Sequence, residues 1–294
     1  MAKRYAIKNL LRTAVNRIPW LEAELLLAAV LKSSRETLRA HSDKTVSASA
    51  LLLFQNLTEQ RQKGVAVACL IGQKEFFALN FFVNKHVLIP RPETEIMVDL
   101  VLEKMRKIQN INDLMLIDVG TGSGCIPISI MKALKHGNIQ AIATDISSRA
   151  ITVAKKNAKS HGVDIKFFRG NLLEPLFNKL AIKQYHHKTI ITANLPYLTH
   201  YQWQSETSIQ KEPKTALIGG GKDGLNLYRK LLQQLQKIIK NNKNFFLFLE
   251  IDPSQSNFIS SFIYKHFPDA CLIIKKDWGG NDRVIEIDFP ASFG

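Results

Sequence analysis

The pattern of apolar and polar positions predicts helices in the first part of the chain. Apolar residues recur at helical spacing over Ala6–Val15, Leu21–Leu31 and Ala48–Gln62. Asp43 and Ser47 are residue types that cap helices, and they stand between these segments. The pattern therefore predicts a small helical bundle within residues 4–63.

From Val65 to Leu88 the pattern changes to an alternation rich in aromatic residues. This alternation is typical of strands, and we expect a β-hairpin that links the bundle to the rest of the chain. The segment Ile89–Glu95 follows, with two prolines that favour an extended backbone. Glu93 or Thr94 is expected to cap the helix after it, so the segment has the features of a stiff linker.

Beyond the linker, strand and helix patterns alternate, as they do in a parallel sheet. Four strands are predicted, a buried one over Leu114–Val119, a second over Gln140–Thr144, a short one near Ile165–Phe168 and a buried one over Thr189–Ala193. Helices are expected from about Cys125 and from about Ser147 to Ser160.

The ends of these predicted strands carry candidate binding residues. The first strand runs into Gly120–Gly124, whose glycines permit positive φ and a close approach of ligand to backbone. Asp145 ends the second strand, where a carboxylate suits both hydroxyls of a ribose. The third strand leads to Asn171 and Leu172, which would flank an adenine. Together these features predict a nucleoside-cofactor site.

The fourth strand delivers Asn194 to its end, followed by Leu195, Pro196 and Tyr197. Pro196 has no backbone N–H and keeps the chain extended. The Asn194 side-chain oxygen and the Leu195 carbonyl suit an NH2 group, which has two hydrogens to donate. Tyr197 offers a flat wall for the planar group that carries it. A strand followed by an ordinary turn is the alternative for this segment alone.

Composition limits the class of protein. A chain of 294 residues, 46% of them apolar, is long for one domain and supplies an ample core. The run Leu21–Leu31 is too short to span a bilayer and lacks a cleavage site, so we expect a cytoplasmic protein without a membrane segment. The cysteines lack the spacing of a disulfide framework or a zinc site, and no metal is expected: Cys69, Cys125 and Cys271.

The net charge of +15 is unevenly spread. Residues 1–85 contain 13 Lys/Arg against 6 Asp/Glu, and the remaining 209 residues contain 27 against 19. The basic first part would attract an acidic partner, although a general lysine bias explains the count equally well. No aromatic-interleaved basic motif marks a nucleic-acid site, so no stable nucleic-acid partner is expected.

The glycine loop, Asp145 and the Asn194 segment, in this order and at these separations, resemble the class I methyltransferases that use S-adenosyl-L-methionine. A nicotinamide dehydrogenase has a similar architecture, but the G-x-G-x-G spacing and the Asn-x-Pro-Tyr segment argue against it.

Over nearly the whole chain, the sequence resembles the bacterial peptide chain release factor N5-glutamine methyltransferases. The linker Ile89–Glu95 and the N-terminal helical pattern are the most specific points of resemblance. The matching segments occur in the family's order: Leu21–Leu27, Ile71–Gly72, Glu75–Phe76, Ile89–Glu95, Asp118–Gly124, Asn194–Tyr197, Glu212–Pro213, Asp223–Leu225, Glu250 and Asn281–Arg283.

The resemblance implies an α/β class I methyltransferase fold, with a Rossmann-like seven-stranded sheet, an N-terminal helical bundle and a β-hairpin connector. It implies a helical substrate-docking domain over residues 1–64, a connector and linker over 65–92, and a methyltransferase domain over 93–294. The implied reaction transfers a methyl group to N5 of the GGQ-loop glutamine of release factors, supporting translation termination.

Pattern and resemblance together assign the site residues. The candidate catalytic residues are Asn194, Pro196 and Tyr197. The protein substrate is expected to contact Asn194, Leu195, Pro196, Tyr197 and Arg91, although a linker ion pair is an equal alternative for Arg91. The candidate cofactor-binding residues are Gly120, Thr121, Gly122, Ser123, Gly124, Asp145, Asn171, Leu172 and Asn194.

Two departures from the family pattern keep alternatives open. Leu195 stands where the family has proline, and Asn-Leu-Pro-Tyr resembles the ribosomal RNA adenine dimethyltransferases. An rRNA or DNA adenine-N6 methyltransferase is therefore the second hypothesis, and a binding protein without catalysis is the third. The segment Gly219–Gly221 looks one residue longer than in the family. The first 85 residues favour the release factor enzymes, because we recognise no counterpart of them in the adenine dimethylases.

Overall fold

The computed structural model describes residues 5–108, 114–134, 139–177, 188–239 and 245–289. These residues form two compact units. The first comprises Met1–Gln73 with Thr207–Lys211, and the second comprises Lys74–Glu206 with Glu212–Gly294. Among the described residues, no helix is both long and apolar enough to cross a membrane.

The first unit is helical, as the apolar spacing predicts. Its helices are α1 (Ile7–Ala14), α2 (Trp20–Leu31), α3 (Arg35–Ala40), α4 (Ala48–Gln62) and α5 (Val67–Ile71), with a short pair β1 (Tyr5–Ala6) and β2 (Thr45–Val46). The predicted cap Ser47 is confirmed, because its side chain accepts a hydrogen bond from the Ala50 N–H. Asp43 forms an ion pair with Lys8 at 2.5 Å instead of capping a helix.

A buried carboxylate joins two helices of this unit. Glu24 on α2 is fully buried, and its oxygens accept hydrogen bonds of 2.7–3.1 Å from Arg35 and Arg39 on α3. The hydrogen bond from Arg39 is the main reason that the pKa of Glu24 falls to about 2. Because burying an unpaired carboxylate is costly, the two arginines fix how α3 packs on α2.

The expected hairpin is shorter than its predicted span. Val67–Ile71 is helical, since Val67, Leu70 and Ile71 lie at helical spacing and pack on the core of the first unit. The strands are β3 (Gln73–Phe76) and β4 (Leu79–Phe82), joined by two residues of positive φ.

The second unit contains a seven-stranded sheet in the order β10-β11-β9-β8-β5-β6-β7. Strands β5 to β9 are parallel, and β11 is antiparallel to both of its neighbours. This is the predicted class I methyltransferase sheet. The strand bounds are β5 (Leu114–Val119), β6 (Gln140–Asp145), β7 (Lys166–Arg169), β8 (Lys188–Ala193), β9 (Phe245–Glu250), β10 (Cys271–Lys276) and β11 (Asp282–Phe289).

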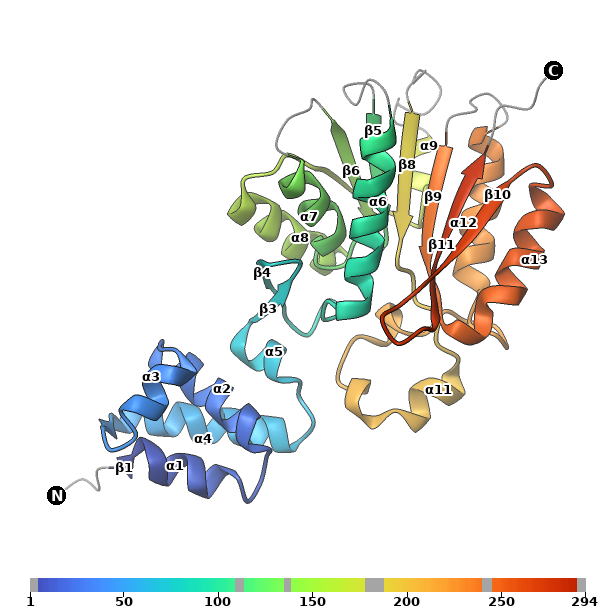
Figure 1. Cartoon of the computed structure of the whole chain (residues 1–294). Coiled ribbons are helices and arrows are strands. Elements are labelled where there is room, and N and C mark those ends of the chain that lie inside the picture. Colours follow the sequence, from blue (N-terminus) through green and yellow to red (C-terminus); the bar gives the residue numbers. More distant parts are fainter. Residues whose placement is uncertain (1–4, 109–113, 135–138, 178–187, 240–244, 290–294) are drawn as a thin grey trace. The chain divides into compact units, whose positions relative to one another are not determined.

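Helices cover both faces of this sheet (Figure 1). One apolar core lies under α6 (Glu95–Lys107), α7 (Cys125–Ala133) and α8 (Ser148–His161), together with the hairpin residues Phe76 and Phe81. The other lies under α9 (Glu174–Phe177), α12 (Asn226–Ile239) and α13 (Ser256–His266). A short helix, α11 (His200–Ser205), follows β8.

The register of the strands brings their carboxyl ends to the same level. Val119 at the end of β5 pairs with Thr144 on one side and with Ala193 on the other. Ala193 in turn pairs with Leu249, one residue before the end of β9. The residues that follow these strands therefore meet at one edge of the sheet, where ligands of open α/β sheets bind.

Candidate functional site

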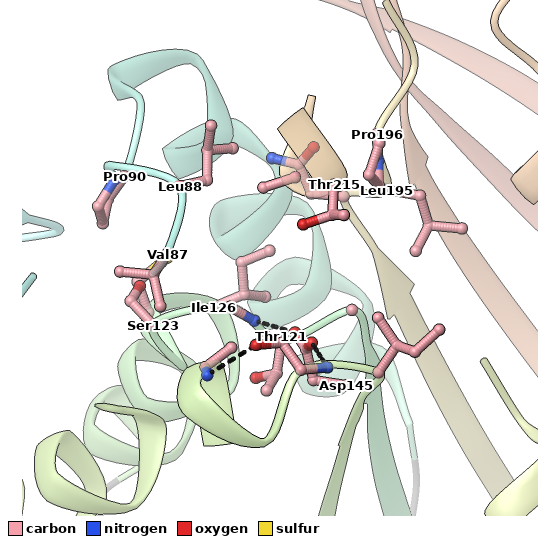
Figure 2. Close-up of a pocket in the computed structure, with 18 of the residues that line it drawn as sticks. Val87, Leu88, Pro90, Thr121, Ser123, Ile126, Asp145, Leu195, Pro196 and Thr215 are labelled. Atoms are coloured by element: carbon pink, nitrogen blue, oxygen red, sulfur yellow. Dashed lines mark hydrogen bonds between the residues drawn. The ribbon is translucent and has the colours of Figure 1, made fainter. Parts of the chain in front are cut away.

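A cavity lies at this edge, and most of the predicted site residues line it. In Figure 2, Thr121 and Asp145 lie on one side of the cavity, and Leu195 and Thr215 lie on another. The predicted residues that line it are Arg91, Gly120, Thr121, Gly122, Ser123, Asp145, Asn171, Leu172, Asn194, Leu195 and Pro196. Gly124 and Tyr197 are not in its wall.

The glycine loop is held by hydrogen bonds to the second strand. The N–H groups of Gly120 and Thr121 both donate to the Thr144 carbonyl, at 2.9 and 3.0 Å. The Gly122 N–H donates to Asp145 Oδ2 at 2.9 Å. Gly120 has φ +74°, and a Cβ there would lie 2.8 Å from Leu195 Cδ2, so the loop and the Asn194 segment are in direct contact.

Gly124 serves the packing behind this loop. It has φ +80°, and a Cβ at this position would lie 2.9 Å from Ile128 on α7 and 3.2 Å from Ala154 on α8. The missing side chain at Gly124 therefore lets the two helices pack closely. This packing fixes the position at which the loop ends and α7 begins.

Asp145 keeps acceptor capacity for a ligand. Its Oδ1 accepts from the Ser147 N–H at 2.8 Å and its Oδ2 from Gly122, so each oxygen retains a further lone pair. Burial raises the pKa of Asp145, and these two backbone hydrogen bonds act in the opposite direction. A half-buried carboxylate at the wall of a cavity suits a pair of adjacent hydroxyls.

The turn after β7 is held in a strained conformation. Leu172 has φ +57°, a conformation that non-glycine residues adopt rarely. Gln234 of α12 maintains it, because its Oε1 accepts from the Leu173 N–H at 2.8 Å and its Nε2 donates to the Asn171 carbonyl at 3.4 Å.

The Asn194 side chain is oriented by the linker. Asn194 Nδ2 donates to Thr94 Oγ1 at 3.1 Å, so the amide oxygen remains as the acceptor. Thr94 lies at the start of α6, but its side chain makes no capping hydrogen bond, so the predicted cap is wrong there. The hydroxyl binds Asn194 instead. The linker thus contributes a residue of the site.

Beneath this pair lies the buried carboxyl group of Glu250 at the end of β9. Burial raises the pKa of Glu250 to about 7, and the Thr94 hydroxyl and the Arg283 guanidinium beside it act in the opposite direction. The Tyr197 hydroxyl donates to Glu250 Oε1 at 3.5 Å. Tyr197 therefore faces inward, packing on the core of the second unit.

Leu195 makes a backbone hydrogen bond that a proline at this position could not make. The Leu195 N–H donates to the hydroxyl of the buried Tyr228 at 3.1 Å. That hydroxyl has one hydrogen and is closer to the Glu250 carbonyl than to the Leu195 carbonyl, which lies 3.3 Å away. The Leu195 carbonyl therefore keeps its capacity to accept a hydrogen bond.

The segment around Gly219–Gly221 packs against the backbone that follows Asn194. A Cβ on Gly219 would lie 2.4 Å from the Pro196 carbonyl oxygen, and one on Gly224 would lie 2.0 Å from that of Tyr197. Gln255 Nε2 also donates to the Tyr197 carbonyl, at 2.8 Å. These contacts hold the turn rigid.

Comparison with known proteins identifies the family. A model described as the PrmC N-terminal domain matches residues 5–72, and one described as the methyltransferase small domain matches residues 93–207. The release factor glutamine methyltransferase of Bacillus anthracis is 33% identical over 267 residues, covering 89% of this chain and 90% of that protein. The protein of the same name from Dictyoglomus turgidum is 36% identical over 275 residues, covering 91% and 90%. The chain belongs to the release factor glutamine methyltransferase family.

As a member of this family, the chain is an S-adenosylmethionine-dependent methyltransferase. The fold is shared more widely. The catalytic domain of human METTL16, solved with a MAT2A 3′UTR hairpin, matches with a TM-score of 0.54 at 14% identity, over 85% of this chain and 86% of that one. At this identity the similarity shows the fold alone.

Some residues of this methyltransferase site were not foreseen from the sequence, and Glu212 is one of them. It forms an ion pair with Arg91, and its other oxygen accepts a hydrogen bond from the Ile89 N–H at 3.0 Å. The ion-pair alternative for Arg91 is therefore observed. Thr94 and Glu250 occur in segments that resemble the family, and this resemblance is the feature of the sequence that could have indicated them as site residues. Tyr228 and Gln255 carry no local signal, because each acts through contacts with distant residues.

Proposed function

We propose that this enzyme transfers a methyl group from S-adenosyl-L-methionine to the side-chain amide nitrogen of a glutamine in a peptide chain release factor. The proposal depends most on the Asn194 amide. Its Nδ2 donates to Thr94, so its oxygen remains free to accept a hydrogen bond, and Asn194 lies in the wall of the same cavity as the glycine loop. Family membership supplies the substrate class.

The cofactor is proposed to lie against the glycine loop, Asp145 and the Asn171–Leu172 turn. The residues present fit it, because Asp145 has lone pairs for ribose hydroxyls and Gly120–Gly122 bring bare backbone to the cavity. When bound, S-adenosyl-L-methionine supplies an electrophilic methyl group on a sulfonium.

Asn194 and Leu195 are proposed to position the nucleophile. A carboxamide nitrogen is a poor nucleophile because its lone pair is delocalised. When Asn194 Oδ1 and the Leu195 carbonyl each accept one N–H, the nitrogen is held in one orientation and positive charge developing on it is stabilised. The proton becomes acidic only late in the transfer, so no side chain is assigned as general base.

Pro196 and Tyr197 are proposed to keep this acceptor pair rigid. Pro196 has no N–H to compete for acceptors, and Tyr197 anchors the turn through Glu250 and Gln255. Arg91 contributes through the linker, where its ion pair with Glu212 holds the segment that carries Thr94. The expected contact of Arg91 with the substrate is not part of this proposal, because the guanidinium is already paired with Glu212.

The helical unit is proposed to dock the release factor. It carries much of the basic charge of the chain and matches the model of the PrmC N-terminal domain. A release factor substrate would place the reaction in the cytoplasm, and no membrane or stable nucleic-acid partner is proposed.

The test is mass spectrometry of purified release factor and ribosomal RNA after each is incubated with full-length enzyme and cofactor. A mass increase of one methyl group on a release factor glutamine is expected. Methylation of an rRNA adenine with the glutamine unmodified would replace this proposal by the adenine hypothesis, which the Asn-Leu-Pro-Tyr sequence first suggested. The hydrogen bond from Leu195 to Tyr228 gives that sequence a structural explanation that does not require a different substrate.

A further inference from the structure

Exposed aromatic side chains gather along one part of the second unit. Among its described residues, the large apolar side chains that are more than 60% exposed are Ile146 (61%), Tyr201 (79%), Phe258 (62%) and Trp278 (95%). Ile146 lines the cavity and belongs to the cofactor side. The other three are aromatic and lie outside the cavity wall.

All three aromatics follow the carboxyl end of a strand. Tyr201 lies on α11, after β8, and Phe258 lies in the first turn of α13, after β9. Trp278 follows β10, which runs parallel to β9 because both are antiparallel to β11. The three residues therefore lie at the edge of the sheet where Asn194 lies, on the Asn194 half of the strand order and away from β6 and β7. We call these three residues the aromatic rim.

Trp278 is held in its exposed position by an ordered loop. Asp277 Oδ1 accepts from the N–H groups of Gly279 and Asn281, both at 2.9 Å. Asp277 Oδ2 accepts from Arg283 at 3.0 Å. A rigid loop that presents an indole loses little conformational entropy when a partner covers it.

The same loop is connected to the acceptor site. Arg283 Nη1 donates to the Ile251 carbonyl at 3.3 Å, directly after Glu250. The positive charge of Arg283 also opposes the rise in the pKa of Tyr197, so the guanidinium lies near that side chain. The loop that carries Trp278 is thus linked through Arg283 to the residue after Glu250 and to Tyr197, which follows Asn194 in the proposed substrate segment.

The charges around the rim favour a protein partner over a nucleic acid. Residues 198–206 and 252–264 contain no lysine or arginine. The cations that flank Trp278 are paired, Lys276 with Asp282 at 3.0 Å and Arg283 with Asp277. Stacking on nucleic acid is normally combined with cations that neutralise phosphates. Here Lys276 and Arg283 are already paired with carboxylates, and Lys214, the cation beside α11, lies over the Trp203 ring, 4.3 Å from its centroid.

We propose that the aromatic rim of Tyr201, Phe258 and Trp278 docks the protein that carries the target glutamine, on the surface around its glutamine loop. This inference rests on the proposed function. Tryptophan and tyrosine are the residues that most often contribute large shares of binding free energy in protein interfaces, and apolar exposure at the mouth of a site marks interaction surfaces.

The test compares Trp278→Ala and Tyr201→Ala with the control Tyr264→Ala in the full-length enzyme. Tyr264 is 49% exposed and lies near the other end of α13, about 9 Å along the helix from Phe258. With intact release factor, we expect KM to rise about tenfold or more for Trp278→Ala, with kcat and calorimetric cofactor affinity unchanged. Tyr264→Ala should behave as wild type, and Trp278→Phe should recover part of the loss.

Hydroxyl-radical footprinting supplies a direct readout, in which release factor, but not cofactor, should protect Trp278 from oxidation. A KM for release factor within twofold of the wild-type value in both rim variants would overturn the proposal about the rim. The proposed function would still stand in that case, because the wild-type enzyme methylates release factor. Wild-type enzyme that fails to methylate release factor removes the proposed function and the rim with it. A loss confined to RNA methylation would assign the rim to nucleic acid instead.

Discussion

Asn194 connects three segments of the chain through one side chain. It follows β8, its Nδ2 binds Thr94 of the linker, and the pair lies above Glu250 of β9. Asn194→Ala is expected to reduce turnover on the order of 10²-fold or more, because one preorganised acceptor at the reacting nitrogen is lost. Cofactor affinity should change much less. Single-turnover methyl transfer measures the effect.

The control for this substitution is Asn80→Ala, an exposed asparagine remote in sequence from the site. Single-turnover rates equal to wild type in Asn194→Ala would show that the acceptor pair does not drive the reaction.

Asp145 is the residue on which the proposed cofactor site depends most. Asp145→Ala should weaken S-adenosyl-L-methionine binding roughly 10- to 150-fold, since a hydrogen bond to a charged group is worth about 1.5–3 kcal/mol. Isothermal titration calorimetry measures the affinity, with the exposed Asp164→Ala as control. Unchanged affinity in Asp145→Ala would contradict the assignment.

Glu250 is expected to make stability depend on pH. Its pKa rises from 4.5 to about 7 on folding, so the folded state binds the proton more tightly than the unfolded state. Its stabilising contribution is fully present below pH 4.5 and is lost as pH rises through about 7. Glu250→Gln cannot ionise and should gain stability relative to wild type over this window, on the order of 3 kcal/mol.

Urea denaturation of both proteins at several pH values measures this difference. The same difference at pH 4.5 and pH 8 would show that Glu250 does not titrate on folding in this range.

At the scale of elements, α8 holds the hairpin and the glycine loop together. Asn157 is buried; its Oδ1 accepts from the Phe82 N–H at 2.8 Å, and its Nδ2 donates to the carbonyls of Phe82 and Ser123 at 3.0 and 2.9 Å. It therefore pairs with β4 as another strand would, and at the same time binds the loop.

Asn157→Ala should destabilise the enzyme by about 2–3 kcal/mol, because three hydrogen bonds are lost and buried backbone groups are left unpaired. Cofactor affinity should fall severalfold, since Ser123 loses its support. Denaturation and calorimetry measure the two effects, with the exposed neighbour Lys155→Ala as control. Wild-type stability in Asn157→Ala would contradict this view of α8.

At the scale of the whole molecule, the hairpin belongs to the methyltransferase unit. Phe76 and Phe81 are buried in the core under α6, α7 and α8, so a cut near Val87 would remove part of that core. The unit begins at Lys74. A fragment of residues 74–294 therefore separates the proposed cofactor site from the proposed docking unit and keeps both buried hairpin residues, Phe76 and Phe81.

This fragment should bind cofactor as the full chain does but lose most methylation of intact release factor. Short glutamine peptides should be poor substrates even for the full chain, because remote binding energy is then unavailable to orient the amide. Calorimetry and mass spectrometry measure the two properties. Full activity of the fragment on release factor would show that docking does not need the helical unit.

The sequence pattern was sufficient to predict an element wherever the residues of that element alone determine its structure. The buried strands before Gly120, Asp145 and Asn194 are confirmed to within a residue or two, because continuous apolar runs with polar ends allow few other arrangements. The helix Val67–Ile71 was predicted as strand, since so short an apolar run has no decisive period until the core it packs on is known.

The sequence by itself determined the fold class, the order of the binding segments and the edge of the sheet at which they meet, because glycine, proline and strand-end chemistry act within a few residues. Only the tertiary structure decided how the Asn194 segment is held. Thr94, Tyr228 and Glu250 lie between 33 and 100 residues from Asn194 or Leu195 in the sequence, and strand order and helix packing bring them there. The chemical use of Leu195, the inward direction of Tyr197 and the pKa of Glu250 follow from those contacts, which no local pattern contains.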